Sequence, residues 1–251
     1  MDIVQDFYDS MASDYDKLFQ DWNAETRKQA QILEKLFNGL GFDRSAGILD
    51  CACGIGTQAI GLAELGFHVT ASDYSRGELA EAEKRAGERG VSIRFAWADF
   101  RHLEDVFSET FDIVIAMDNA LPHMLTQEDL ERAVKSMAGR VRPGGLFVAS
   151  IRDYDQLLEE KPPCSKPYIH KIENRKRVSF QTWDWSGDHY HLTQYIIEDG
   201  PFLEIGKYES EYRAVKREEL TSLLYQAGFK QVTWMFTEKT GFYQPVVAAV
   251  R

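Results

Sequence analysis

The chain has 251 residues, of which 44% are hydrophobic, so it is long enough to bury a substantial core in one large domain. Its 40 acidic side chains outnumber the 29 basic ones and give a formal net charge of −11. Nucleic-acid binding depends largely on cationic contacts to phosphates. We therefore expect no nucleic acid as a partner, and we interpret the negative charge as an aid to solubility.

The N-terminal residues are polar and charged, without the apolar segment of a signal peptide. No stretch approaches the roughly 18 apolar residues that a membrane span requires. The cysteines, Cys51, Cys53 and Cys164, are odd in number and lack a second ligand pair, which favours buried free thiols over a disulfide framework or a zinc site. We expect a cytoplasmic protein without a metal or a membrane contact.

A regular alternation of elements follows an amphipathic helix predicted over residues 23–40. Alternating apolar runs and helical patterns are typical of a parallel sheet covered by helices on both faces. The predicted strands span 47–51, 67–73, 92–99, 111–118 and 145–153, and the predicted helices span 57–66, 76–90 and 126–141.

The pattern changes near residue 153. A Pro-rich connector at 161–167 precedes three predicted strands, and we interpret residues 153–212 as an antiparallel β insertion. A helix and a hairpin with its turn at 238–241 complete the chain, which we predict to be a single α/β domain over 1–251. Its Rossmann-like sheet has seven strands, the last one antiparallel. The later strands span 177–185, 189–199, 203–214, 229–236 and 241–251, and the helix spans 216–228.

The segment 48–57 (ILDCACGIGT) ends the first predicted strand and opens a helix. Open α/β sheets bind ligands at the carboxyl ends of their strands. Gly54 and Gly56 permit a close approach of the backbone to a ligand. No Lys follows as it does in a phosphate-binding loop, and Ala59 stands at the third glycine position of a dinucleotide-binding loop. The glycines alone therefore leave a dinucleotide-binding enzyme open.

Acidic residues end the next strands. Asp73 is placed to accept hydrogen bonds from both hydroxyls of a ribose. Asp99 could accept from an adenine amino group while Phe100 covers the ring. Two further segments complete the set, Met117-Asp118-Asn119 after the fourth strand and Arg142-Pro143-Gly144-Gly145 before the fifth.

This ordered set resembles the class I S-adenosylmethionine (SAM)-dependent methyltransferases, closely over residues 40–152 and loosely through the final hairpin. The resemblance implies SAM as the cofactor and no metal. It disfavours a nicotinamide enzyme, which Asp99 and the turn at 142–145 do not match. Residues 1–40 resemble the helical lid of this superfamily, in which Tyr15 closes over SAM or packs within the helices. The residues that the resemblance assigns to the cofactor are Tyr15, Asp50, Cys53, Gly54, Gly56, Asp73, Tyr74, Asp99, Phe100 and Met117.

A longer match, over 119–125, 141–146 and 152–155, resembles the glycine and glycine/sarcosine N-methyltransferases. It implies that Arg152 binds the carboxylate of an amino acid and that Asn119 helps to position it. Arg152 could equally form an ion pair with Asp153 or Asp155. His123 is either a core histidine or a substrate contact whose near-neutral pKa would suit proton removal.

The resemblance implies transfer of a methyl group to a small-molecule amine, that of glycine, sarcosine or a similar amino acid. Two alternatives stay open: O- or C-methylation of another small molecule, and a SAM-binding protein without catalysis. No sequence pattern predicts an oligomeric state.

Overall fold

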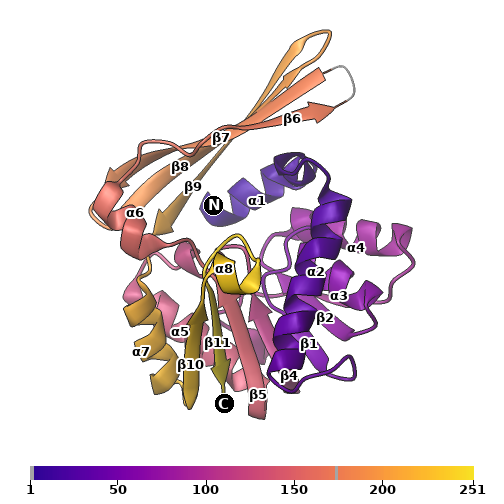
Figure 1. The fold of residues 1–251 in the computed structure, drawn as a ribbon, viewed down its shortest axis with the longest axis vertical. Helices are drawn as coiled ribbons and strands as arrows, with labels where there is room; N and C mark the ends of the chain where they lie inside the picture. Colours follow the sequence, from indigo (N-terminus) through magenta and orange to yellow (C-terminus); the bar gives the residue numbers. More distant parts are fainter. Residues whose placement is uncertain (1–2, 173–174) are drawn as a thin grey trace.

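The computed structural model describes residues 3–172 and 175–251, and its main feature is a seven-stranded sheet (Figure 1). The strand order is β10-β11-β5-β4-β1-β2-β3. β11 is antiparallel to both of its neighbours and the remaining neighbours are parallel, which confirms the predicted fold. The strands are β1 (Gly47–Asp50), β2 (His68–Asp73), β3 (Arg94–Trp97), β4 (Phe111–Ala116), β5 (Val141–Ser150), β10 (Gln231–Met235) and β11 (Val246–Val250).

Helices cover both faces of the sheet because the central strands are apolar on both sides. Ile113 and Ile115 of β4 belong to the core beneath α2 and α3, whereas Val114 belongs to the core beneath α5 and α7. Successive side chains of a strand point to opposite faces, so one apolar run serves both layers. No helix in the described ranges is both long and apolar enough to cross a membrane. The helices are α1 (Ile3–Met11), η1 (Tyr15–Leu18), α2 (Trp22–Gly39), α3 (Thr57–Glu64), α4 (Arg76–Glu88), η2 (Leu103–Asp105), η3 (Leu121–His123), α5 (Gln127–Arg140) and α7 (Arg217–Gln226).

The insertion after β5 contains more structure than the three strands expected of it. It begins with α6 (Tyr154–Glu160) and forms a separate four-stranded antiparallel sheet in the order β6-β7-β8-β9. The additional strand, β6, is a five-residue edge strand with too few residues to show a clear alternation. The sheet extends over α1 at one end of the domain (Figure 1). Its strands are β6 (Tyr168–Ile172), β7 (Arg175–Ser186), β8 (His189–Asp199) and β9 (Leu203–Arg213).

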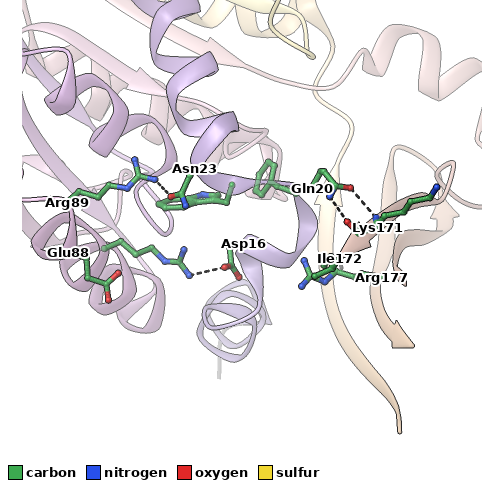
Figure 2. A pocket seen from close by; sticks show the side chains of 11 residues that line it. Asp16, Gln20, Asn23, Glu88, Arg89, Lys171, Ile172 and Arg177 are labelled. Atoms are coloured by element: carbon green, nitrogen blue, oxygen red, sulfur yellow. Dashed lines mark hydrogen bonds and ion pairs between the residues drawn. The ribbon is translucent and has the colours of Figure 1, made fainter. Parts of the chain in front are cut away.

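The N-terminal segment is fastened to this second sheet by polar contacts. The amide of Gln20 donates to the main-chain oxygen of Lys171 (2.9 Å) and accepts from its main-chain nitrogen (3.2 Å), so it pairs with the edge of β6 as a strand would (Figure 2). Lys17 of η1 binds Glu198 of β8 at 2.6 Å. A cavity of about 390 Å³ lies between these segments (Figure 2). Asp16, which lines it, forms an ion pair with Arg85 of α4 at 3.5 Å.

The connection between β10 and β11 is longer than the predicted turn. The expected strands at 229–236 and 241–251 are shorter in the structure, and a short helix, α8 (Thr237–Thr240), lies between them. Pro245 immediately precedes β11 and has no N–H to donate to a ladder. The residues between α8 and β11 run over the carboxyl ends of the strands, where Tyr243 and Gln244 contact the site described next.

Candidate active site

Two adjacent cavities lie at the carboxyl ends of the parallel strands. The first, of about 250 Å³, is lined by the loop after β1, the end of β2 and the end of β3. The second, of about 730 Å³, lies between the loop after β5, the insertion and the residues before β11. Tyr8, Tyr15 and Asp118 line both cavities, so these three side chains mark the junction. A molecule in each cavity would meet its neighbour there.

The glycine-rich loop uses its predicted residues in different ways. Gly54 lines the first cavity, and a Cβ on it would lie 2.9 Å from a carboxylate oxygen of Glu78. Gly56 does not line the cavity: it caps α3 with φ +89°, and a Cβ there would lie 2.7 Å from Ile60. The thiol of Cys53 is buried behind the loop, whereas Cys51 lines the cavity. One of the two glycines therefore gives space to a ligand and the other shapes the turn.

Two acidic residues, Asp50 and Asp73, lie next to this loop. Asp50 is fully buried behind the cavity, and burial raises its pKa to about 8. Asp73 lines the cavity and accepts from the main-chain nitrogens of Gly54 and Ser75, each at 2.8 Å. Burial raises the pKa of Asp73 to about 6. The carboxylate at the end of β2 thus fixes the glycine loop to the start of α4, in addition to facing the cavity.

The first cavity is also lined by Tyr74, Asp99, Phe100 and Met117, all four of which the sequence predicted. Tyr74 stacks on Trp97, with ring centroids 6.1 Å apart. Asp99 is engaged in a bidentate pair with Arg101, at 2.8 Å and 2.6 Å. Sequence reasoning did not single out this arginine, although it lies only two positions from the predicted acid. Phe100 supplies an apolar surface beside a charged pair, an arrangement suited to a polar aromatic ring.

The chain after β4 adopts an unusual conformation. Asp118 and Asn119 have φ values of +55° and +71°, a left-handed region that costs non-glycine residues energy and is enriched at functional sites. The conformation turns the Asp118 carboxylate to the junction of the cavities, where it accepts from Gln58 (2.7 Å) and Tyr243 (2.8 Å). Burial raises the pKa of Asp118 above its ordinary value. Both donors were absent from the sequence prediction.

Asn119 acts on its neighbours through both ends of its amide. Its oxygen accepts from the main-chain nitrogen of Arg152, and its nitrogen donates to the Tyr154 hydroxyl, each at 3.0 Å. The side chain is 3% exposed. Asn119 therefore holds the loop after β5 in place. The sequence predicted that Asn119 helps to position the acceptor, and in the structure it would do so through Arg152.

Arg152 lies in the second cavity without an acidic partner. Its guanidinium donates to the Tyr190 hydroxyl (3.0 Å) and to Gln181 (2.8 Å), and lies over the rings of Trp183 and Tyr212. The acids that could have paired with it, Asp153 and Asp155, bind Arg217 instead. Within the described ranges Arg152 forms no ion pair. Only two of its five N–H groups are used by these bonds, so donors remain for a ligand.

His123 is a neutral hydrogen-bonding residue rather than a near-neutral base. Its Nδ1 lies 3.2 Å from the main-chain oxygen of Glu211, which can only accept, so Nδ1 carries the hydrogen and Nε2 accepts from Tyr8 at 2.8 Å. Burial lowers the pKa of His123 to about 3. Of the two alternatives that the sequence left open, the structure favours the core histidine, because the ring is buried against Tyr212 and the lowered pKa does not suit proton removal.

Comparison with known proteins decides what kind of site this is. A model of a methyltransferase domain family matches residues 48–145, which contain the glycine loop and the acids at the ends of β2 and β3. The chain is 26% identical to a glycine/sarcosine N-methyltransferase from Parasynechococcus marenigrum over 247 residues, covering 96% of this chain and 82% of that protein. These comparisons show a SAM-dependent methyltransferase that has the fold of the class I enzymes.

Further comparisons place this methyltransferase among its relatives. Over 144 residues it is 38% identical to glycine N-methyltransferase from Rattus norvegicus, which covers 53% of this chain and 49% of the relative. A SAM-dependent methyltransferase from Clostridium acetobutylicum has the same fold, with a TM-score of 0.73 over 97% of each chain at 20% identity. CalS10, an amino pentose methyltransferase from Micromonospora echinaspora, gives a TM-score of 0.73 at 19% identity over 90% of this chain and 91% of its own.

The residues of the first cavity fit SAM. Gly54 leaves space that a Cβ would fill, and one oxygen of the buried Glu78 carboxyl lacks a hydrogen-bond partner among the described residues. Asp73 and Asp99 could hold the ribose and adenine through their carboxylates, with Phe100 against the ring. SAM is the cofactor of this methyltransferase, and when bound it supplies an electrophilic methyl group on a positively charged sulfur.

Proposed function

We propose that this methyltransferase acts on the amine of a small amino acid of the glycine or sarcosine type. The observation that carries the proposal is the guanidinium of Arg152, which lies in the larger cavity without an acidic partner among the described residues. Arg152 is partly buried, and a charge withdrawn from water is costly unless a partner offsets the cost. A ligand carboxylate would supply that partner and could bind two N–H groups at once. The names of the glycine and glycine/sarcosine N-methyltransferase relatives support the same acceptor.

The junction of the cavities would hold the amine. Methyl transfer from a sulfonium is an in-line displacement, so the nitrogen must lie about 3–3.5 Å from the methyl carbon. Because Tyr8 donates to His123, its oxygen keeps lone pairs that can accept from the amine. Asp118 lies at the same junction and accepts from two neutral donors. These oxygens would orient the nitrogen lone pair and hold the proton that the amine releases.

Two segments would enclose the reactants in this proposal. The described part of the N-terminal segment, residues 3–40, acts as the lid, because Tyr8 of α1 and Tyr15 of η1 line both cavities. Residues 153–212 act as the acceptor-side wall, through Gln181, Trp183 and Tyr212. Water would thereby be excluded from the transfer, which strengthens each polar contact within the site.

A second candidate acceptor is an amino group on a larger molecule such as an amino sugar. The volume of the larger cavity, about 730 Å³, favours it, as does the structural similarity to CalS10, an amino pentose methyltransferase. O- or C-methylation and SAM binding without catalysis are the remaining alternatives. Transfer of radiolabelled methyl groups to a panel of glycine, sarcosine, glycinamide and an amino sugar separates the amino-acid acceptor from the amino-sugar acceptor.

Arg152→Lys tests the carboxylate contact directly. A lysine keeps the charge and loses the bidentate geometry, so the KM for glycine or sarcosine should rise about tenfold, with SAM affinity nearly unchanged. Arg217→Lys is the matched control, because that arginine already has two acidic partners and does not line the cavity. Equal turnover of glycine and glycinamide, or equal effects of the two substitutions, would contradict the proposal.

A further inference from the structure

A carboxyl group that no part of the proposed reaction uses lies in the SAM cavity. Glu78, in the first turn of α4, is 2% exposed and lines the cavity. Its Oε1 has no hydrogen-bond partner among the described residues. A buried polar atom without a partner carries a free-energy cost, and such atoms often mark a ligand site.

The position of Glu78 in its helix explains why its side chain is not used for capping. Ser75 is the N-cap of α4 and accepts from the main-chain nitrogen of Glu78 at 3.0 Å. In the usual capping box the glutamate three positions later accepts from the main-chain nitrogen of the cap residue. Here that nitrogen donates to Asp73 at 2.8 Å, so the glutamate side chain is displaced from its capping role. It lies beside Gly54 instead.

The other carboxyl groups that line the cavity are all supplied with donors. Asp73 accepts from two main-chain nitrogens, and Asp118 accepts from Gln58 and Tyr243. Asp99 and Asp129 share Arg101, the cavity's only cation among the described residues. Five carboxyl groups therefore face one guanidinium, and Glu78 is the one with an unpartnered buried oxygen. This arrangement favours a cationic ligand over a neutral one.

The cofactor changes its charge during the reaction. The sulfur of SAM is positively charged, and the thioether of the product S-adenosylhomocysteine (SAH) is neutral. We propose that Glu78 distinguishes the two by charge, its carboxyl ionising against bound SAM and becoming protonated again once SAH has formed. The ionisation releases one proton to solvent, and reprotonation takes one back. The site thereby binds the substrate cofactor more tightly than the product. The proposal does not depend on which acceptor is methylated.

The surroundings of Glu78 support a neutral carboxyl before SAM binds. Burial raises the pKa of Glu78 well above its ordinary value, and the nearby charges of Asp73 at the end of β2 and Asp9 of α1 act in the same direction. Tyr8 of α1 and Tyr15 of η1 also lie close enough to interact electrostatically with it. None of these groups is a cation, so a bound sulfonium would be the first to favour the ionised form.

Isothermal titration of Glu78→Gln with three ligands tests the proposal without a methyl acceptor. The ligands are SAM, SAH and sinefungin, a SAM analogue with an amine-bearing carbon in place of the sulfonium. We expect SAM and sinefungin to bind about tenfold more weakly and SAH to change less than twofold. Glu81→Gln is the matched control, because Glu81 lies one turn later on α4 and is paired with Arg85 outside the cavity.

Proton release gives a second readout. SAM titrations in phosphate and in Tris buffer should show a buffer-dependent enthalpy for the unsubstituted enzyme, and the dependence should shrink in Glu78→Gln. An equal loss of affinity for all three ligands would overturn the proposal, because SAM and SAH share the ribose and adenine. Unchanged affinity for all three would overturn it as well. Retained SAH binding shows that the variant is folded.

Discussion

Replacing Asp73 by asparagine should alter how the stability of the enzyme depends on pH. Burial raises the pKa of Asp73 from its ordinary value of 3.8 to about 6. The folded chain therefore binds this proton more tightly than the unfolded chain. The resulting stabilisation is complete below pH 4 and is lost as the pH rises through 6. A difference of about two pKa units corresponds to about 3 kcal/mol, taken as an order of magnitude.

The asparagine cannot ionise, so the Asp73→Asn variant should lack this contribution. The free energy of unfolding of the unsubstituted enzyme, minus that of the variant, should decrease by up to about 3 kcal/mol from pH 4 to pH 6 and then level off. Urea denaturation at half-unit pH intervals, without SAM, measures this difference. Asp43→Asn is the control: Asp43 accepts from Ser45 and its pKa is lowered, so its contribution changes only below about pH 4 and the difference should stay nearly constant from pH 4 to 7. A difference for Asp73→Asn that stays constant between pH 4 and 7 would refute the reasoning.

Two further predictions concern the cavities. Gly54→Val should abolish SAM binding in calorimetry while thermal unfolding remains cooperative. A branched side chain would enter a space in which even a Cβ lies 2.9 Å from Glu78. Undiminished affinity for SAM would show that the loop is not part of the cofactor site. His123→Asn should lower kcat/KM without changing the shape of its pH profile between pH 5 and 8, because a histidine whose pKa is about 3 does not titrate there. A pH-dependent limb that disappears in the variant would restore His123 as a proton acceptor.

The parts of the site that the sequence predicted are those adjacent to strand ends. Gly54, Asp73 and Phe100 lie at or just after the carboxyl ends of β1, β2 and β3, and the carboxyl ends of parallel strands meet at one edge of a sheet. The same alternation of apolar strands and amphipathic helices predicted the seven-stranded sheet and its antiparallel last strand. The local sequence pattern was enough to predict those site residues that are close to one another in the sequence.

Residues that reach the site from elsewhere could not be predicted in this way. Tyr8 and Tyr243 come from opposite ends of the chain and meet the cavities only through tertiary packing. Glu78 has the spacing of a capping glutamate, and only the competing bond from Ser75 to Asp73 frees it. Gly56 was assigned to the cofactor on its motif, yet its positive φ serves the start of α3. The glycine motif alone did not show whether a glycine contacts the ligand or is needed for the backbone conformation of the turn.

The place of the insertion between β5 and the final strands has an evolutionary consequence. β11 pairs with β5 although the second sheet lies between them in sequence, so folding must close a long loop in any case. The entropy of closing a loop grows only slowly, by about 0.6 kcal/mol for each doubling of its length. The insertion can therefore lengthen, shorten or be exchanged at small cost while the strands that hold SAM keep their register. With the insertion as the proposed acceptor-side wall, acceptor range is the property of this enzyme that is most open to change, by natural drift or by design.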